Sequence, residues 1–311
     1  MNAPTSGQLP ATETADSEAR PSALSYLVFP VVMFGGIGIA AAMLSAGVAP
    51  KYINPSIVGP VFVLMTILER VHPYRREWNR SHGDFWVDVG YFFVTSFTVL
   101  CTTTALNLLL IPLGGRLSDH APFLVWPREW PLAAQVLLAL LVAEFGHYWV
   151  HRLEHETPLL WRFHAVHHSA PRLYWLNAAR FHPFDMMMSG VAGFGPLILL
   201  GCPEHVLAMF TLIGTIHNVF QHANIDVRLG PLNYVFSMAE LHRWHHSRTV
   251  TEANANYGGH LIWWDMLFRT RFLPKDRRPP GNIGLSDLPS FPTTLVKQLV
   301  APFRIETYRE P

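Results

Sequence analysis

The sequence predicts an all-α integral membrane protein with four to six membrane helices and a histidine-rich cytosolic cap. Half of the 311 residues are apolar and only 14% are charged, whereas about a quarter of the residues in soluble domains are charged. Two charge-free stretches, residues 21–50 and 89–115, are longer than the roughly 20 residues that a helix needs to cross the hydrocarbon core. Dense histidine clusters follow the apolar stretches, which predicts a polar cap beyond the membrane helices.

The membrane helices are expected in a fixed order after an N-terminal leader. Residues 1–20 are rich in Ala, Thr, Ser and Glu and lack a basic start, so they are interpreted as a disordered leader and not as a signal peptide. Residues 21–311 then form the membrane-bound domain, with spans predicted near residues 23–48, 52–69, 86–112 and 131–150. Two further apolar stretches, 186–200 and 206–220, are joined by a turn-like break and predict a helical hairpin that either crosses fully or is re-entrant.

The basic residues between the spans predict the orientation. Four arginines, Arg70, Arg75, Arg76 and Arg80, separate the second and third spans, whereas the turn between the first two offers only Lys51. Because loops rich in Lys and Arg stay in the cytosol, every histidine cluster is expected on the cytosolic side. The expected location is a bacterial inner membrane or an equivalent cytosol-facing membrane.

Charge and cysteine content exclude several kinds of function. A formal net charge of +1 and the absence of a basic run give no electrostatic case for nucleic-acid binding. The two cysteines, Cys101 and Cys202, both lie in apolar segments, which excludes a disulfide scaffold, a zinc finger and a thiolate-bound iron–sulfur cluster. Any metal must therefore be bound by histidine.

Histidines recur at helical spacing in three places. Residues four apart lie on one face of a helix, and the pattern H-x-x-H-H adds a third ring at i+3. With one isolated histidine between the second and the third place, this gives nine candidate metal ligands: His151, His155, His164, His167, His168, His222, His242, His245 and His246. Nine exceed the capacity of one ion, so two metals are predicted, each with four or five nitrogens and an open position.

Iron is the metal that the residues favour. Imidazole suits zinc, copper, iron and nickel, but hydrolysis typically keeps three protein ligands and a water on each catalytic zinc, so nine histidines would be more than zinc needs. An all-histidine pair without oxidisable thiolates is expected for oxygen activation at iron. Two alternatives are weighed. One is a zinc metallohydrolase in which His151-x-x-Glu154-His155 binds the metal and Glu154 acts as base. The other is a haem-binding electron-transfer subunit, which would need paired histidines deep within the spans.

The motifs resemble those of the fatty acid hydroxylase and sterol desaturase superfamily of membrane diiron oxygenases. The strings HRLEHETPLLWRFHAVHHS, RFHP, QHAN, HRWHHS, NYGG and IWWDMLF carry this resemblance over about residues 84–272. It implies two iron ions, O2 as co-substrate, and hydroxylation of a membrane lipid, which is favoured over desaturation. No haem, ferredoxin or cytochrome b5 motif accompanies the histidines, so a separate electron donor is expected, namely a ferredoxin, a cytochrome b5-like protein or a reductase.

The remaining histidines are divided into two sets. His147, His182 and His217 are interpreted as ligands or as groups that hold a ligand, and the resemblance makes His182 a neighbour of the site and His222 an additional ligand. A structural role is expected for His72, His82, His120, His205 and His260. The sequence departs from the family pattern at Glu144, at Asp185 and at the closing residues 268–270, none of which is a proposed ligand.

Overall fold

The computed structural model describes residues 21–120, 125–279 and 281–309, so the predicted leader lies outside the described residues. The long helices are α1 (Ala23–Ser45), α2 (Ile53–Val71), α3 (Phe85–His120), α4 (Leu132–Glu156), α5 (Pro158–His168), α6 (Pro183–Leu199) and α7 (Glu204–His222). Short helices complete the chain: η1 (Pro50–Tyr52), η2 (Arg76–Asn79), η4 (Trp175–Ala179), η5 (Gly230–Tyr234), α8 (Ala239–His245), α9 (Val250–Ala253), α10 (Trp263–Leu267), α11 (Leu295–Val300) and η6 (Ala301–Tyr308). Within these described ranges, extended pairing is limited to three isolated bridges. The all-α prediction is confirmed.

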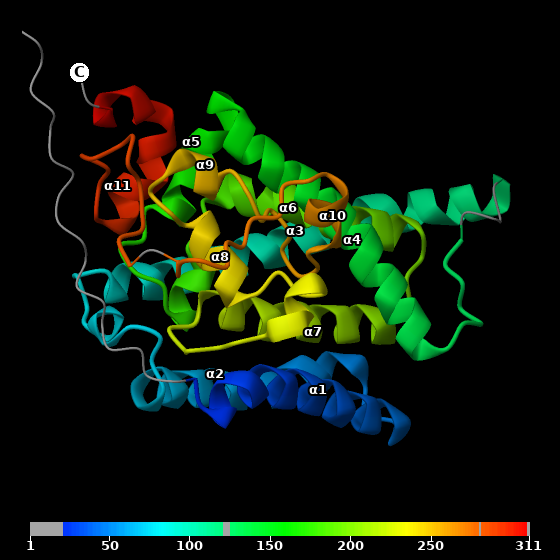
Figure 1. The fold of residues 1–311 in the computed structure, drawn as a ribbon. Coiled ribbons are helices and arrows are strands. Elements are labelled where there is room, and N and C mark those ends of the chain that lie inside the picture. The colour runs from blue at the N-terminus through cyan, green and yellow to red at the C-terminus, as the bar shows by residue number, and fades with distance from the viewer. Residues whose placement is uncertain (1–20, 121–124, 280, 310–311) are drawn as a thin grey trace, which may run out of the picture.

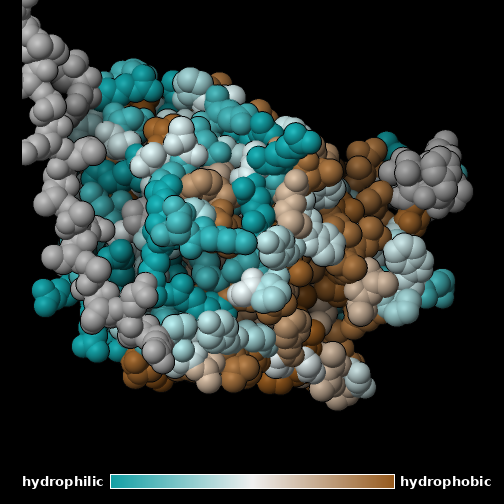
Figure 2. Space-filling view, viewed as in Figure 1, coloured by the Kyte–Doolittle hydropathy of each residue, from teal (hydrophilic) through white to brown (hydrophobic). Residues whose placement is uncertain are grey.

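Four helices are long and apolar enough to cross a membrane: α1, α2 together with η1, α3 and α4. Most of their surface faces outward, since only 11% of the α3 window is buried inside the protein. Figure 2 shows the apolar surface over the helical bundle and the hydrophilic surface over the cap. The four predicted spans agree with these helices. The fourth continues past residue 150 to Glu156, which places His151 and His155 on its last two turns.

Helices α6 and α7 form a hairpin that packs against the membrane helices. Helix α6 packs against α3 and α4, and it lies very close to α4. A Cβ added at Gly146 would lie 2.2 Å from the carbonyl oxygen of Ala192, so only glycine allows this approach of the two backbones. The tip of the hairpin meets the segment between α3 and α4, where the Trp126 N–H donates to the Leu200 carbonyl at 2.9 Å.

The arginine-rich loop and the histidine-rich cap lie at the same end of the helices, on the left in Figure 1. The loop pairs with the segment that follows α7, because the Tyr74 N–H donates to the Asn224 carbonyl at 3.2 Å. The Arg75 N–H donates to the Asn224 side-chain oxygen at 2.9 Å. The cytosolic location of this end stays a prediction.

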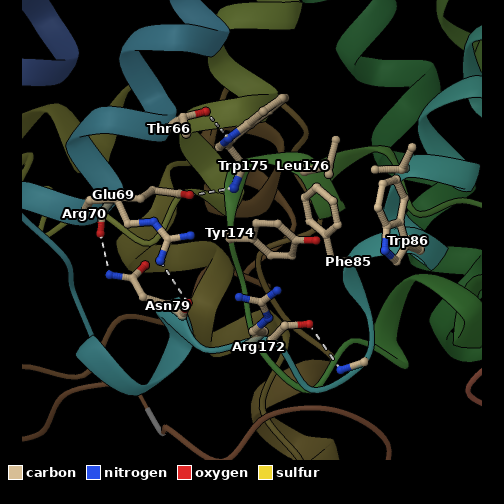
Figure 3. Close-up of a pocket in the computed structure, with 13 residues that line it drawn as sticks. Thr66, Glu69, Arg70, Asn79, Phe85, Trp86, Arg172, Tyr174, Trp175 and Leu176 are labelled. Carbon is tan, nitrogen blue, oxygen red and sulfur yellow. Dashed lines mark hydrogen bonds between the residues drawn. The ribbon is translucent and has the colours of Figure 1, made fainter.

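A pocket of about 730 Å³ opens between α2 and α3 at the cap end of the bundle (Figure 3). Its floor is the segment that leads into η4, including Arg172, Tyr174 and Trp175. A second depression, of about 510 Å³, lies in the cap beside α8.

Candidate metal centre

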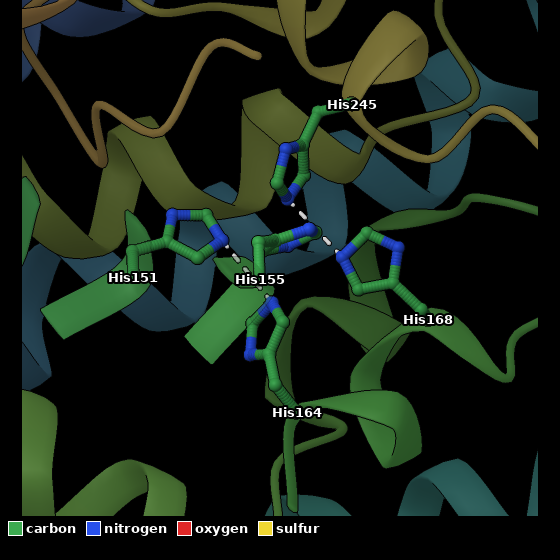
Figure 4. A group of neighbouring side chains, drawn as sticks. All are labelled: His151, His155, His164, His168 and His245. Carbon is green, nitrogen blue, oxygen red and sulfur yellow. Dashed lines mark hydrogen bonds between the residues drawn. The ribbon is translucent and has the colours of Figure 1, made fainter. Parts of the chain in front are cut away.

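The nine predicted histidines meet in two groups at the cap end of α4. In each group, every histidine offers one ring nitrogen, and these nitrogens all lie within 4.8 Å of one another. The first group, shown in Figure 4, contains His151, His155, His164, His168 and His245. The second group contains His167, His222, His242 and His246. All nine side chains are buried except His155, which is half-buried.

The two H-x-x-H-H motifs exchange their middle residues between the groups. His164 and His168 of α5 belong to the first group, whereas His167 between them belongs to the second. The motif of α8 and its C-terminal cap does the reverse, since His245 joins the first group while His242 and His246 join the second. Residues four apart share one helix face and the i+3 residue is rotated from it. Each motif therefore contributes to both groups.

Backbone carbonyls fix the orientation of two rings in the first group. His151 Nδ1 lies 2.7 Å from the Tyr257 carbonyl oxygen, and His245 Nδ1 lies 2.8 Å from the Ala255 carbonyl oxygen. A carbonyl can only accept, so both Nδ1 atoms donate. In a neutral imidazole, Nε2 then carries a lone pair, and these two lone pairs point into the group.

The second group is oriented in the same way. His167 Nδ1 donates to the Arg180 carbonyl at 3.2 Å, and His222 Nδ1 donates to Asn177 Oδ1 at 3.0 Å. The amide of Asn177 cannot be reversed, because its Nδ2 donates to the Arg172 carbonyl at 2.6 Å. Histidine ligands of metals commonly donate their second nitrogen to a carbonyl or a carboxylate in this manner.

Burial keeps the imidazoles of α5 and α8 neutral. Desolvation, followed by the neighbouring imidazoles, holds the pKa values of His164, His168, His242, His245 and His246 well below the ordinary value. For His167, desolvation lowers the pKa to about 3. Neutral imidazole is the form that binds a metal.

The donor set fits two divalent metal ions. His242 Nε2 lies 2.9 Å from the Nε2 atoms of both His222 and His246. A single proton on His242 Nε2 cannot form good hydrogen bonds to both of these nitrogens. Within the two groups, three buried ring nitrogens have no hydrogen-bond partner among the described residues: His155 Nε2, His242 Nδ1 and His246 Nδ1. Converging lone pairs and unpartnered buried nitrogens are costly unless a cation binds between them.

Two carboxyl groups lie behind His164. Asp185 Oδ2 is 2.9 Å and Glu154 Oε2 is 3.4 Å from His164 Nδ1, while His164 Nε2 faces His151 Nε2 at 3.1 Å. Glu154 therefore lies on the side of the ring away from the first group. A metallohydrolase would need this carboxylate as a base beside the metal, which this position does not provide.

The three histidines of uncertain role lie outside both groups. His182 is the N-cap of α6, where its Nδ1 accepts from the Phe184 N–H at 3.2 Å. The ring of His147 is 5.5 Å from that of His151, centroid to centroid. His217 is fully buried, neither of its ring nitrogens has a partner among the described residues, and its centroid is 5.5 Å from that of His260. The structure does not bring these three rings to a group.

Two histidines that were expected to be structural connect parts of the bundle. His260 Nδ1 lies 2.7 Å from Glu144 Oε2, and His72 Nε2 lies 2.9 Å from Ser25 Oγ. His260 lies in the cap and Glu144 in α4, so this contact ties the cap to a membrane helix.

No sequence pattern indicates the role of Asn177. It is an isolated asparagine in η4, in a segment without a metal-binding motif, and it lies 45 positions from the histidine that it orients. Asp185 could have been found through its position three residues after His182, in RFHPFD, but only as a departure from the family pattern.

The fold and this site define a helical membrane protein with two histidine groups at one end of its bundle. Comparison with known proteins identifies the family. Residues 136–270 match the fatty acid hydroxylase family. The chain is 35% identical to an ornithine lipid hydroxylase of Rhizobium tropici over 269 residues, which are 85% of this chain and 80% of that protein. The chain belongs to the fatty acid hydroxylase family.

Two other relatives match smaller parts of their own length. An alkylglycerol monooxygenase of Danio rerio is 30% identical over 228 residues, which are 73% of this chain and 49% of that protein. A methylsterol monooxygenase of Rattus norvegicus is 28% identical over 148 residues, 46% of this chain and 48% of that protein. No solved structure matches the chain.

Proposed function

We propose that this protein is a membrane-bound diiron oxygenase that hydroxylates a lipid, using O2 and electrons from a separate donor. The observation that carries the proposal is the convergence of nine imidazoles, eight buried and one half-buried, in groups of five and four. The proposed ligands of one iron are His151, His155, His164, His168 and His245, and those of the other are His167, His222, His242 and His246. Iron is favoured over zinc because so many nitrogen ligands exceed what catalytic zinc uses.

The relatives support the substrate class. Their names describe hydroxylation or monooxygenation of an ornithine lipid, an alkylglycerol and a methylsterol, all of which are lipids with a polar group. We infer that the substrate here is also a membrane lipid. An ornithine lipid is the first compound to test, because that relative matches 85% of this chain.

Two bound iron ions would supply the activation of O2 that attack on an unactivated C–H bond requires. The protein's own residues hold and orient the ligands and exclude water. The carbonyls of Tyr257 and Ala255 orient two rings of the first group, and Arg180 and Asn177 orient two rings of the second. Such preorganisation would hold the nitrogen ligands of each iron in place.

We further infer that the metal centre faces the cytosol of a bacterium or an equivalent compartment, where an electron donor can reach it. A ferredoxin, a cytochrome b5-like protein or a reductase would serve. The arginine-rich loop at the cap end supports this orientation.

Metal content and lipid products test the proposal together. Protein purified anaerobically from membranes should contain about two irons per chain with a diiron Mössbauer spectrum. Lipid extracts from cells with the gene should contain a species one oxygen heavier than its precursor, and this species should be missing without the gene. One tightly held zinc per chain, with activity restored by zinc alone, would exclude the diiron oxygenase.

A further inference from the structure

The pocket between α2 and α3 lies at the cap end of the membrane helices (Figure 3). Thr66, Glu69 and Arg70 line it from α2, and Phe85, Trp86 and Val89 line it from α3. Helix α2 contacts α3 little, and η4 packs against both helices. The pocket therefore opens beside the outward faces of two membrane spans and is closed on its inner side by the protein.

Arg70 is the cation that this pocket offers to a ligand. One of its nitrogens, Nη1, donates to the Asn79 carbonyl at 3.0 Å, and the guanidinium extends toward the middle of the pocket in Figure 3. Its other nitrogens have no hydrogen-bond partner among the described residues. Arg172, by contrast, is occupied, because its Nε and Nη2 donate to the two oxygens of Asp84 at 2.7 and 3.0 Å.

The acidic residue of the pocket is turned away from a ligand. Glu69 is only 5% exposed. Its Oε1 accepts from the backbone N–H groups of Trp175 and Asn224 at 2.7 and 2.9 Å. Hydroxyl and amide groups of Thr66, Ser81 and Asn79 complete the polar lining. The pocket thus presents one guanidinium and several neutral polar groups, which suits an anion.

Aromatic side chains flank the polar lining on the membrane side. Trp86 is 77% exposed and Phe85 is 42% exposed, and Trp175 stacks on Phe62 of α2 with ring centroids 4.8 Å apart. Exposed tryptophans mark the level of the lipid headgroups in membrane proteins. Farther along α2 and α3, large apolar residues are exposed, including Val63, Phe93 and Phe97.

We propose that this pocket binds the headgroup of an anionic membrane lipid, whose phosphate or carboxylate pairs with Arg70 and whose acyl chains lie along α2 and α3. Basic pockets between membrane helices bind acidic lipid headgroups in other membrane proteins. The pocket volume of about 730 Å³ lies within the range that is usual for small-molecule binding pockets. The proposal does not depend on the diiron assignment, since none of the pocket residues belongs to either histidine group.

The same contacts connect the pocket with the metal centre. Glu69 holds the backbone of both Trp175 and Asn224. Trp175 begins the short helix that contains Asn177, and Asn224 follows His222 by two residues. A lipid bound against this floor therefore stabilises the segments that position His222.

Native mass spectrometry of the full chain in detergent tests the proposal, with phosphatidylglycerol and phosphatidylcholine as the added lipids. We expect retention of phosphatidylglycerol over phosphatidylcholine, and about tenfold weaker retention in Arg70→Gln, which loses a charge-assisted contact. Arg70→Lys should retain more lipid than Arg70→Gln. The matched control is Arg76→Gln, an exposed arginine of η2 outside the pocket, which should bind lipid as the wild type does.

A second measurement covers the case in which Arg70→Gln fails to fold. Phosphatidylglycerol should raise the melting temperature of the wild-type chain in detergent more than phosphatidylcholine does, because a ligand of the folded state stabilises it. Equal retention or equal stabilisation by the two lipids would overturn the proposal. So would displacement of phosphatidylglycerol by millimolar inorganic phosphate, because the site would then recognise a free anion and not a lipid.

Discussion

His168 and His246 stack face to face, with ring centroids 4.4 Å apart and an angle of 25° between the ring planes, although they belong to different histidine groups. His168 also contacts His245 of its own group, Nε2 to Nε2, at 3.1 Å. The two groups therefore share a packed boundary and are not independent sites. A change in one ligand should be felt by the other group, since residues in direct contact are energetically coupled.

Replacing the middle residue of either motif tests this coupling. His167→Ala removes one of four nitrogens from the second group, and His245→Ala removes one of five from the first. No nearby thiol can substitute, because both cysteines lie in apolar segments away from the groups. We expect hydroxylation to be lost in both variants and iron content to fall further in His167→Ala. Metal analysis and product formation are measured together.

The matched control is His205→Ala, at the start of α7 and outside both groups, which should keep its iron and its activity. His120, at the end of α3, is also expected to tolerate alanine. Full activity in His167→Ala or His245→Ala would refute the ligand assignment.

The same measurements on His182→Ala decide the role of His182. Retained iron with a lower rate is expected from its position outside the groups, whereas loss of iron would make it a ligand.

Asn177 should control the affinity of the second group. Its Oδ1 accepts from His222 Nδ1, so Asn177→Ala leaves the ring free to rotate or to change tautomer. Groups that orient a metal ligand typically contribute about 10- to 100-fold in metal affinity or activity. We expect a loss of this size in the metal affinity of the second group, measured by competition with a chelator, and a smaller loss in the first group. Asn233→Ala, a buried asparagine bonded to Glu240, is the control and should leave metal affinity unchanged.

The sequence predicts most of the helical bundle because its signals are local. A run such as residues 89–115 has to be buried in hydrocarbon, and histidines at i and i+4 have to share a face. These rules are sufficient for the four spans and for the two motifs. The grouping of nine histidines by five and four was also expected, because a number above one ion's capacity requires a second ion.

The partners of the histidines could not be predicted because they depend on contacts between distant segments. Ala255 and Tyr257 accept through backbone carbonyls, which every residue has, so no residue type marks them. The position of His217 was open for a related reason. Helical periodicity shows that a ring lies on one face of α7, but only the packed structure shows that this face meets His260 and not the metal groups.

The orientation of the cap in the membrane can be tested at Thr249, an exposed residue three positions after His246. We expect Thr249→Cys to react with an impermeant thiol reagent only in inverted vesicles or opened cells, because the arginine-rich loop at the same end should remain in the cytosol. The wild-type chain, with Cys101 and Cys202, gives the background. Labelling from the outer face of intact cells would reverse the topology.

A buried ion pair beneath the second group should contribute strongly to stability. Arg180 Nε donates to Asp88 Oδ1 at 2.6 Å, and both side chains are almost fully buried. Asp88→Ala leaves the guanidinium buried without its partner, which typically costs about 3–5 kcal/mol. Since the Arg180 carbonyl also orients His167, the melting temperature in detergent and the iron content should both fall. Glu156→Ala, which breaks the half-exposed pair with Arg152, should cost at most about 1 kcal/mol; equal losses in the two variants would contradict this account.

The metal-free chain should lose stability on acidification. Burial lowers the pKa of His167 to about 3 and holds the pKa values of His242 and His246 well below the ordinary value, whereas the same rings in the unfolded chain titrate near about 6.5. Below that pH the unfolded chain binds more protons than the folded chain, so the free energy of unfolding decreases as the pH falls from about 6.5 toward 3. Each such histidine contributes up to about 1.4 kcal/mol per pH unit to this decrease in the free energy of unfolding. These groups produce no pH dependence above about pH 7.5, where both states are neutral.

The melting temperature of metal-free protein in detergent, followed from neutral to acidic pH, measures this decrease, and His167→Gln should make it shallower by the contribution of one group. A melting temperature that rises on acidification, or a slope that is unchanged in His167→Gln, would show that His167 does not remain neutral in the folded chain.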